Sequence, residues 1–546
     1  MHKTSSSYRL RGPLVSAAFT AVTIAFAGLP GLSVASAQAA EAPRYGGRFE
    51  IGIPGFTICY DATQTPYVPF VHYAIVDNLL EQDRNSGRIL PWLAERYDVQ
   101  NDGARYVLHL RRGVTFSNGQ PFTAAAVKLN FDNHVEQGKI GKSPQASAYL
   151  SGYTGAEILD DYTIVINFKA PKAGFLQALA EKPLGIIAPE TITTKTAEER
   201  CAQGVIGSGP YVISKIVENQ EIVLSARKDY AWNSPNQLHT GRPYVDELVF
   251  RLIPESGVRV GSLLSGQLDA ITTVPALDID RVEAGGSTLV TAPFAGSVYT
   301  FFFNYTKPIT SDPAVRKAFL IGLDRQEIVD AAYTKFDRAA SGVLSSKVPQ
   351  YIDQSAKLAY DPEGAKALLD AAGWIPGPDG IRQKDGTRLA LEYKYTEEAD
   401  KAAFELVQQQ LRQIGIAFEI RQVTRSELTQ WEPPNRGWDV VSASLTRPDA
   451  DILLSRYHPA YSWWLSGQKL DPYPEVTSLL EQQTVTVDTA KRSALAAQIQ
   501  NLLVDKAYAV PLRQVTAVWA LGQNAHDLWL TLPGFPNFSD VWLDAD

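Results

Sequence analysis

The side chains that most often carry enzyme chemistry are present in this sequence, but they are not grouped as catalysis requires. The seven histidines stand apart, with no HExxH motif and no pair four residues apart that could hold zinc. Ser208, in GSGP, lacks the glycine pattern of a nucleophile elbow. No two of the 59 carboxylates stand out in sequence as a general acid and base. The sequence therefore predicts a protein that is not an enzyme and has no metal and no cofactor; a secreted hydrolase is the most distant alternative.

Two glycine-rich segments have some features of a phosphate-binding loop. GVIGSGPY, residues 204–211, has no lysine and serine or threonine in the required places, and in GKIGKS Glu136 stands where the first glycine should be. Neither segment therefore predicts nucleotide binding. The three glycines of 204–211 instead allow the backbone to approach another surface closely.

Aromatic side chains gather between residues 431 and 464. Trp431, Trp463, Trp464 and Tyr461 could stack on a sugar ring or another flat ligand. An aromatic core under a loop is the equal alternative.

The clearest elements that could position such side chains lie at residues 297–333. The run 298–303 is aromatic and β-branched, which predicts a strand buried on both faces. Asp312 before Pro313 is typical of an N-cap and the first residue of a helix. Asp324 and Glu327 have the spacing of a capping box, which predicts a second helix from Arg325 to about residue 333.

Other elements follow from periodicity and from end signals such as Asp361, Pro362 and Gly373, which bound one helix. A β-α-β alternation spans 247–271, and the sequence predicts further helices at 67–80, 175–179 and 398–414 and strands at 46–53, 104–112, 161–168, 389–395, 416–423 and 437–445.

The sequences of several segments resemble those of the extracellular solute-binding proteins of family 5, the receptors of peptide, nickel, opine and oligosaccharide ABC importers. FFFN, DPAVRKAF and GLDRQEIV carry the resemblance at 301–329, and GRILPWLAERYDV, RRGVTFSNGQPFTAAAVKLNFD and GVIGSGPY carry it at 87–99, 111–132 and 204–211. Ala126 departs from the family, which usually has an acidic residue there. The segments succeed one another in the family's order.

The resemblance implies an α/β protein with the two-lobed periplasmic binding protein fold of cluster C type. Lobe one would comprise 38–82, 199–295 and 508–546, with an extra subdomain inserted at 83–198, and lobe two would comprise 296–507. Two crossings between the lobes would make a hinge around a ligand cleft. The implied partners are a small solute and the transmembrane subunits of an ABC permease, and the protein is expected to be a monomer.

The resemblance also suggests what the cleft binds. Peptide-binding relatives carry an aspartate for the ligand's α-amine, and alignment through Asp449 and Asp451 puts Thr446 there, with Ala443 where relatives have an aromatic residue. Because a buried ammonium without its counter-ion costs several kcal/mol, this replacement disfavours free-amine peptides.

Two basic residues favour an anionic ligand. Lys394 aligns where dipeptide receptors carry an arginine for the ligand carboxylate, and Arg447 follows Thr446. Each could instead be a surface charge or form an ion pair with Asp449 or Asp451. The predicted ligand contacts are Lys394, Arg447, Thr446, Asp449, Tyr60, Trp431 and Trp463.

The predicted solute is therefore small and anionic or amine-blocked, such as an opine-like sugar–amino-acid conjugate or a modified peptide. The alternative is an ordinary di- or oligopeptide whose amine is met by Asp61, Asp449 or Asp451.

The N-terminus predicts export. Lys3, Arg9 and Arg11 precede an apolar run at 14–32 and the small-residue site around Ala37, as in a cleaved signal peptide, although an uncleaved anchor is the alternative. No cysteine follows for lipid attachment, so the protein is expected to be free in a periplasm.

Length and charge agree with this prediction. A chain of 546 residues that is 45% hydrophobic should form more than one domain. Cleavage would remove three basic side chains and change the formal charge from −8 to −11. Such an acidic protein is not expected to bind nucleic acid.

The two cysteines, Cys59 and Cys201, could form a disulfide in an oxidising compartment. Two separate buried thiols are the alternative.

Overall fold

Strand β13 (Gly296–Phe303) is the buried strand that the sequence predicts at 298–303. In the computed structural model of the protein, Phe301, Phe302 and Phe303 are fully buried. β13 pairs with β20 (Val440–Thr446) and β21 (Val510–Gln514), and with β14 (Arg338–Ala339) these strands form a sheet in the order β14-β21-β13-β20. We call the part of the chain built around this sheet lobe two.

The structure describes residues 42–55, 59–62, 64, 70–140, 144–396, 400–432, 435, 437–465 and 470–545. The predicted signal peptide lies outside the described residues, as do the first residues of the helices predicted at 67–80 and 398–414. Residues 43–546 form one compact unit.

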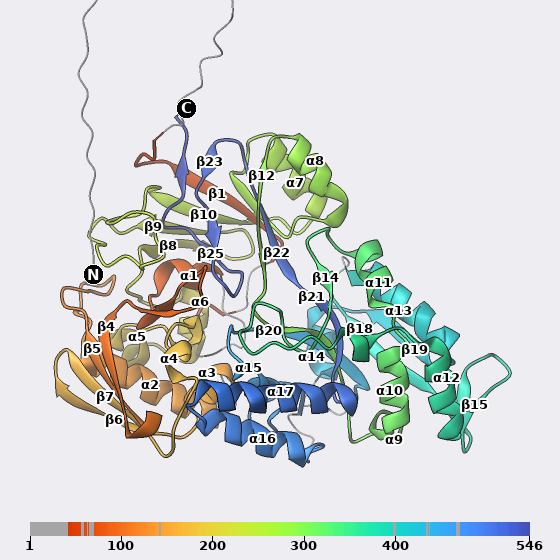
Figure 1. Cartoon of the computed structure of the whole chain (residues 1–546). Helices are drawn as coiled ribbons and strands as arrows, with labels where there is room; N and C mark the ends of the chain where they lie inside the picture. The colour runs from red at the N-terminus through yellow and green to blue at the C-terminus, as the bar shows by residue number, and fades with distance from the viewer. Residues whose placement is uncertain are drawn as a thin grey trace, which may run out of the picture. The chain divides into compact units, whose positions relative to one another are not determined.

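Lobe one is built around a seven-stranded sheet in the order β12-β22-β11-β1-β10-β9-β8 (Figure 1). β1 runs parallel to β10 and β11, which are joined through helix α7 as the predicted β-α-β unit requires, and the other neighbours are antiparallel. The bounds are β1 Arg48–Ile53, β8 Tyr211–Val217, β9 Glu221–Ala226, β10 Glu247–Leu252, α7 Ser256–Leu264, β11 Ala270–Thr272, β12 Thr288–Pro293 and β22 Thr516–Leu521.

The chain passes between the two sheets twice. β12 leads into β13 within the predicted crossing region, and β21 leads into β22 (Figure 1). β21 pairs with β13 in the lobe-two sheet, and β22 joins the lobe-one sheet. The return to lobe one at residue 508 stays a prediction.

A third sheet lies within the stretch predicted as the inserted subdomain. Its antiparallel order is β4-β5-β7-β6, and Leu108, Phe116 and Phe131 belong to a separate buried cluster beneath it with helix α2. The subdomain boundaries at 83 and 198 stay a prediction. The bounds here are β4 Ala94–Gln100, β5 Arg105–Leu110, α2 Ala124–Lys139, α3 Pro144–Tyr149, β6 Tyr153–Asp160, β7 Thr163–Phe168 and α4 Phe175–Ala178.

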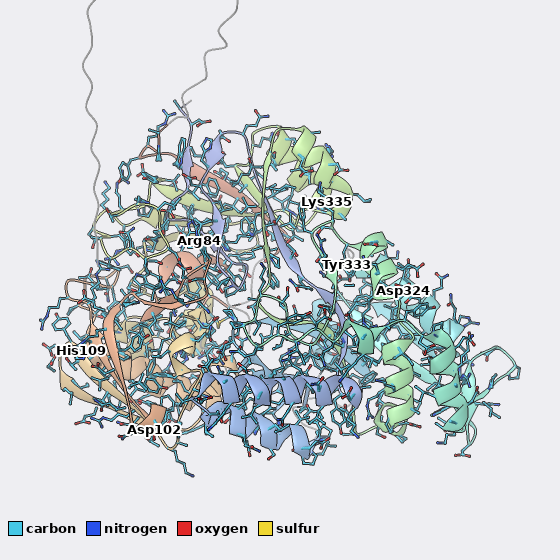
Figure 2. The ribbon with its side chains drawn as sticks, viewed as in Figure 1. Arg84, Asp102, His109, Asp324, Tyr333 and Lys335 are labelled. Carbon is cyan, nitrogen blue, oxygen red and sulfur yellow. A yellow bond between two sulfur atoms is a disulfide. The ribbon has the colours of Figure 1, made fainter. Side chains whose placement is uncertain are left out.

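The predicted helix caps of lobe two are present. The Asp312 carboxylate accepts from Ala314 N at 2.9 Å and begins α10 (Pro313–Ile321). Asp324 (Figure 2) accepts from Glu327 N at 3.0 Å and begins α11 (Arg325–Ala332). The expected return bond of the capping box is replaced, because the Asp324 N–H donates to Gln410 instead.

Lobe two also holds a parallel pair of strands with a helix between them and several helices toward the C-terminus. The bounds are α12 Pro362–Ala371, β18 Ala390–Tyr395, α13 Lys401–Gln413, β19 Ala417–Gln422, α14 Arg425–Trp431, α15 Ile452–Tyr457, α16 Pro474–Val485 and α17 Thr489–Asp505.

The helix predicted at 67–80 is shorter than expected. α1 covers Phe70–Ile75, and β2 (Leu80–Gln82) pairs with β3 (Ile89–Pro91). The glycine loop explains part of this difference, since Gly209 N donates to Ile75 O at 3.0 Å and a Cβ at Gly207 would lie 1.8 Å from that oxygen. The close backbone approach predicted for 204–211 is thus confirmed.

Cys59 and Cys201 form the disulfide that the sequence allows. The bond joins the segment after β1 to helix α6 (Ala197–Gln203), and Tyr60 N donates to Cys201 O at 3.1 Å beside it.

Candidate functional site

A cavity of about 400 Å³ is lined by residues of both lobes. Lobe one contributes strand β12 and the segment around Thr531, the stretch after β2 contributes residues 82–87, and lobe two contributes Lys347 and Pro448. The complete lining is Gln82, Arg84, Asn85, Ser86, Gly87, Thr291, Ala292, Pro293, Ser346, Lys347, Pro349, Pro448, Leu530, Thr531 and Leu532. A space shared by two lobes is the usual location of a small-molecule site.

Two cationic side chains line this cavity from different parts of the chain. Arg84 (Figure 2) is half-buried, with its guanidinium carbon 4.7 Å from the Trp529 ring centroid. Lys347 is exposed on the lobe-two side. A guanidinium fork and an ammonium facing one cavity suit an anionic ligand such as a carboxylate.

A smaller chamber of about 40 Å³ adjoins the cavity, and the two share Gln82, Thr531 and Leu532. Its charged lining is mostly acidic. The complete lining is Tyr73, Asp77, Asn78, Glu81, Gln82, Trp92, Ala180, Glu181, Lys182, Pro210, Gln237, Thr531, Leu532, Pro533, Pro536, Asn537 and Ser539.

Burial controls ionisation in this chamber. It raises the pKa of Glu181 to about 7, against the opposing effect of Arg447, and it raises the pKa values of Asp77 and Glu81. Burial also lowers the pKa of Lys182, and the nearby carboxylates of Asp77 and Glu81 offset part of this decrease.

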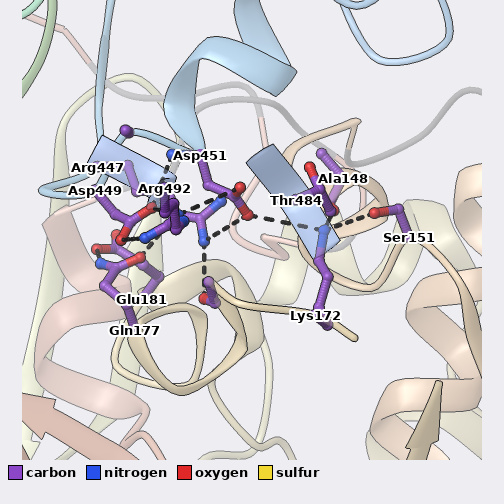
Figure 3. Close-up of polar contacts among 12 residues, drawn as sticks. Ala148, Ser151, Lys172, Gln177, Glu181, Arg447, Asp449, Asp451, Thr484 and Arg492 are labelled. Atoms are coloured by element: carbon purple, nitrogen blue, oxygen red, sulfur yellow. Dashed lines mark hydrogen bonds and ion pairs between the residues drawn. The ribbon is translucent and has the colours of Figure 1, made fainter. Parts of the chain in front are cut away.

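Arg447 belongs to a buried polar network that joins lobe two to helix α4 (Figure 3). Its side chain is fully buried; Nε donates to Gln177 Oε1 at 2.7 Å and Nη2 to Gly174 O at 3.0 Å. Gln177 donates in turn to Glu181 Oε1 at 2.6 Å. The guanidinium therefore lies behind the chamber wall, and its predicted direct contact with a ligand stays a prediction.

Two aspartates complete this network. Asp449 receives two bonds from Arg492, and Asp451 lies 3.4 Å from Arg447, 3.4 Å from Arg492 and 3.8 Å from Lys172 (Figure 3). Burial alone would raise the pKa of Asp449, but the Arg492 guanidinium outweighs it and holds this pKa well below its ordinary value. The structural ion pair that the sequence left as an alternative for Arg447 is present.

Lys394 and Trp431 lie together away from the lining of either cavity. The Lys394 ammonium is 3.2 Å from Glu392 Oε1 and 4.9 Å from the Trp431 ring centroid, and the Trp431 indole donates to Glu392 Oε2 at 2.9 Å. The Lys394 side chain is 11% exposed. The predicted contact of these two residues with a ligand stays a prediction.

The other predicted contacts are separated. Thr446 ends β20, opposite Gly296 and two residues before the cavity-lining Pro448. Tyr60 is buried beside the disulfide, and Trp463 packs against the core of lobe two. Asp61, the third acid considered for a peptide amine, forms an ion pair with Arg200 at 2.7 Å.

The cavity-lining charges Arg84, Lys347, Glu81, Glu181 and Lys182 were not found from the sequence. They lie in segments without a functional motif. Only the fold brings Glu81, Glu181 and Lys182 around the chamber and Arg84 and Lys347 around the cavity. Among the described residues, no three His, Cys, Asp or Glu side chains gather as metal ligands would.

The family model for bacterial extracellular solute-binding proteins, family 5 Middle, matches residues 88–464. The nickel-binding periplasmic protein of Escherichia coli (strain K12) is 25% identical over 468 residues, which cover 83% of this chain and 86% of that relative.

Solved structures show the same fold. The oligopeptide-binding protein AppA of Bacillus subtilis, in complex with a nonapeptide, has a TM-score of 0.77 and 22% identity, with 92% of this chain and all of that chain covered. The binding protein AgaA of A. tumefaciens R10, in complex with agropinic acid, has a TM-score of 0.76 and 21% identity, with 92% and 99% covered. The two-lobed α/β fold predicted from the sequence is confirmed.

Within the described part of the chain, no helix has both the length and the apolar character needed to cross a membrane. Because the family model spans well over half of the sequence, the protein belongs to the bacterial extracellular solute-binding proteins of family 5.

Proposed function

We propose that the protein is the periplasmic receptor of an ABC importer, which captures a small acidic solute between its lobes and delivers it to the membrane permease. The observation that carries this proposal is the cavity of about 400 Å³, to which both lobes contribute walls. A ligand bound there bridges two sheets that are joined by two chain crossings, so binding favours the closed arrangement.

Arg84 and Lys347 are the proposed partners of the solute's carboxylates. They approach the cavity from opposite parts of the chain, one after β2 and one after β14. A solute with two anionic groups, or one bidentate carboxylate, can therefore contact both lobes at once. Such a contact stabilises the closed receptor, because in an open receptor the solute can contact only one of the two cations.

The first candidate is an opine-like sugar–amino-acid conjugate or a modified peptide, with its α-amine substituted. Thr446 supports an acylated, neutral α-nitrogen most directly, since it offers no charge to an ammonium. The secondary amine of a sugar conjugate stays basic but has one N–H fewer to satisfy than a free α-ammonium. Likeness in fold to a receptor in complex with agropinic acid is compatible with it.

The runner-up is an ordinary di- or oligopeptide, in keeping with the fold likeness to an oligopeptide-binding protein. Asp61, Asp449 and Asp451, the acids first considered for the peptide amine, are already paired with arginine or lysine. A receptor for ordinary peptides would therefore need a carboxylate other than these three to pair with the α-amine of the peptide.

Calorimetry on protein freed of bound solute tests the proposal. We expect Nα-(1-deoxyfructosyl)-lysine, whose α-amine carries a sugar, to bind at one site more tightly than alanyl-lysine. Tight binding of alanyl-lysine with no heat from the conjugate would favour the runner-up. A hydrolase would consume its ligand, so we also expect the conjugate to be recovered unchanged after long incubation.

A further inference from the structure

We propose that the small chamber beside the main cavity is a subsite for a protonated nitrogen of the solute, so that the receptor takes a solute with an ammonium group as well as carboxylates. This inference rests on the proposed function and adds a second charge to the ligand. The chamber, of about 40 Å³, shares Gln82, Thr531 and Leu532 with the main cavity, so one ligand can extend into both. Its volume suits an ammonium head rather than a second large group.

The charges lining the chamber do not balance. Asp77, Glu81 and Glu181 supply three carboxyl groups, whereas Lys182 is the only basic side chain in the lining. The Lys182 ammonium is itself held by Val76 O at 2.5 Å. Arg447 and Arg227 offset part of the charge on Glu181 and Asp77 from outside the lining, and one further positive charge inside the chamber would compensate the rest.

The carboxylates have acceptor capacity to spare. Glu81 accepts from Ser234 Oγ at 2.6 Å and from Gln82 N, and Glu181 accepts from Gln177 at 2.6 Å. An ionised carboxylate can accept about four hydrogen bonds, so both can receive an ammonium N–H without losing these partners.

Asn78 provides an independent sign of a missing donor. Its side chain is fully buried and lines the chamber, and its amide nitrogen donates to Leu179 O and Glu181 O. These two bonds fix the orientation of the amide. Its Oδ1 has no hydrogen-bond partner among the residues that the structure describes. Because an unsatisfied buried acceptor is costly, this oxygen favours a ligand that donates.

The aromatic walls also suit a cation. Tyr73 and Trp92 line the chamber, and the Lys182 ammonium already lies 5.7 Å and 5.3 Å from their ring centroids. Ring faces attract positive charge at this range. The raised pKa of Glu181 agrees with an incomplete site, since a bound ammonium would favour its ionised form.

Two matched pairs of solutes test the subsite by calorimetry. The first pair is Nα-(1-deoxyfructosyl)-lysine and its Nε-acetyl form, and the second is alanyl-lysine and its Nε-acetyl form. Within each pair, acetylation removes the terminal positive charge and adds a small acetyl group, so the glutamine variants below are needed to assign the effect to charge. We expect the charged member to bind about tenfold or more tightly than its acetylated partner.

Variants assign the effect to the chamber. Glu81→Gln and Glu181→Gln should each reduce the preference for the charged member to less than about threefold. Asp269→Asn is the matched control, because Asp269 is a buried lobe-one acid outside both cavities, and it should keep the wild-type preference. Proton release on binding can be measured with the wild type alone. Near pH 7, binding of the charged member should release protons from the protein to the buffer as Glu181 ionises, whereas binding of the acetylated member should not.

The outcomes separate this inference from the proposed function. Equal binding of charged and acetylated members, or an unchanged preference in both glutamine variants, would overturn the subsite and leave the receptor function intact. No binding of any of the four solutes would overturn the subsite together with the proposed solute class.

Discussion

The Arg447 side chain donates to Gln177 Oε1 at 2.7 Å although 270 residues separate them in sequence. Arg447 follows β20, an edge strand of the lobe-two sheet, and Gln177 lies in α4 beside the chamber. This bond, with Asp451 and Lys172, links lobe two to the part of the chain that lines the acidic chamber. The arginine singled out from the sequence thus positions the wall of the site.

We expect Arg447→Met to lower the free energy of unfolding by about 3–5 kcal/mol, because it leaves Asp451 and Gln177 with fewer partners in a buried network. Urea unfolding followed by tryptophan fluorescence measures this change. Arg388→Met is the control, since Arg388 is 49% exposed and its ion pair with Asp379 should contribute less than about 1 kcal/mol. Equal effects of the two substitutions would contradict a structural role for the buried network.

The disulfide should stabilise the folded protein substantially. Cys59 and Cys201 close a loop of 142 residues, so we expect the Cys59→Ser/Cys201→Ser variant to lose about 2–5 kcal/mol. The urea midpoint of the wild type should fall with reductant, whereas that of the double variant should not respond. A wild-type midpoint that is the same with and without reductant would count against this contribution.

Glu181 should make the ligand-free protein less stable as the pH rises. Burial raises its pKa from about 4.5 to about 7 in the presence of Arg447, Gln177, Glu81 and Asp449, so the folded state holds this proton more tightly than the unfolded state. The stability that this group contributes is present below about pH 4.5 and is lost between pH 4.5 and 7.

The Glu181→Gln variant tests the direction of this pH dependence. Relative to the wild type it should gain stability on going from pH 4.5 to pH 8, by up to about 3 kcal/mol. Comparing the two proteins at each pH cancels the titration of groups that do not interact with Glu181. A difference that stays constant over this range would show that Glu181 has an ordinary pKa.

Lys394→Ala distinguishes a ligand contact from an internal ion pair. Because Glu392 and Trp431 already hold the ammonium, we expect the change to weaken binding of a carboxylate solute by less than about 1 kcal/mol. Calorimetry with Nα-(1-deoxyfructosyl)-lysine measures it. A loss of about 2 kcal/mol or more would instead support the direct contact predicted from the sequence.

The sequence predicts local features well, because their causes are local. Asp312 begins α10, and the aromatic run before Asn304 forms a buried strand, since caps and apolar runs act within a few residues. The two-lobed fold was predicted instead from the resemblance, whose segments succeed one another in the family's order.

Contacts between distant segments were harder to predict. The pairing of β21 with β13, for example, joins residues about 200 positions apart. Arg84, Glu181 and Lys347 come together only in the folded chain, and their local sequences resemble those of ordinary surface segments. Residue spacing also could not show that Arg447 is buried.

The central claim is that Arg84 and Lys347, one from each side of the shared cavity, bind the carboxylate of one solute. The most direct test is calorimetry of Nα-(1-deoxyfructosyl)-lysine against wild type, Arg84→Ala, Lys347→Ala and the double variant. We predict one site in the wild type, a loss of about tenfold in each single variant and a larger loss in the double variant. Wild-type affinity in the double variant, or no binding to the wild type, would contradict the claim.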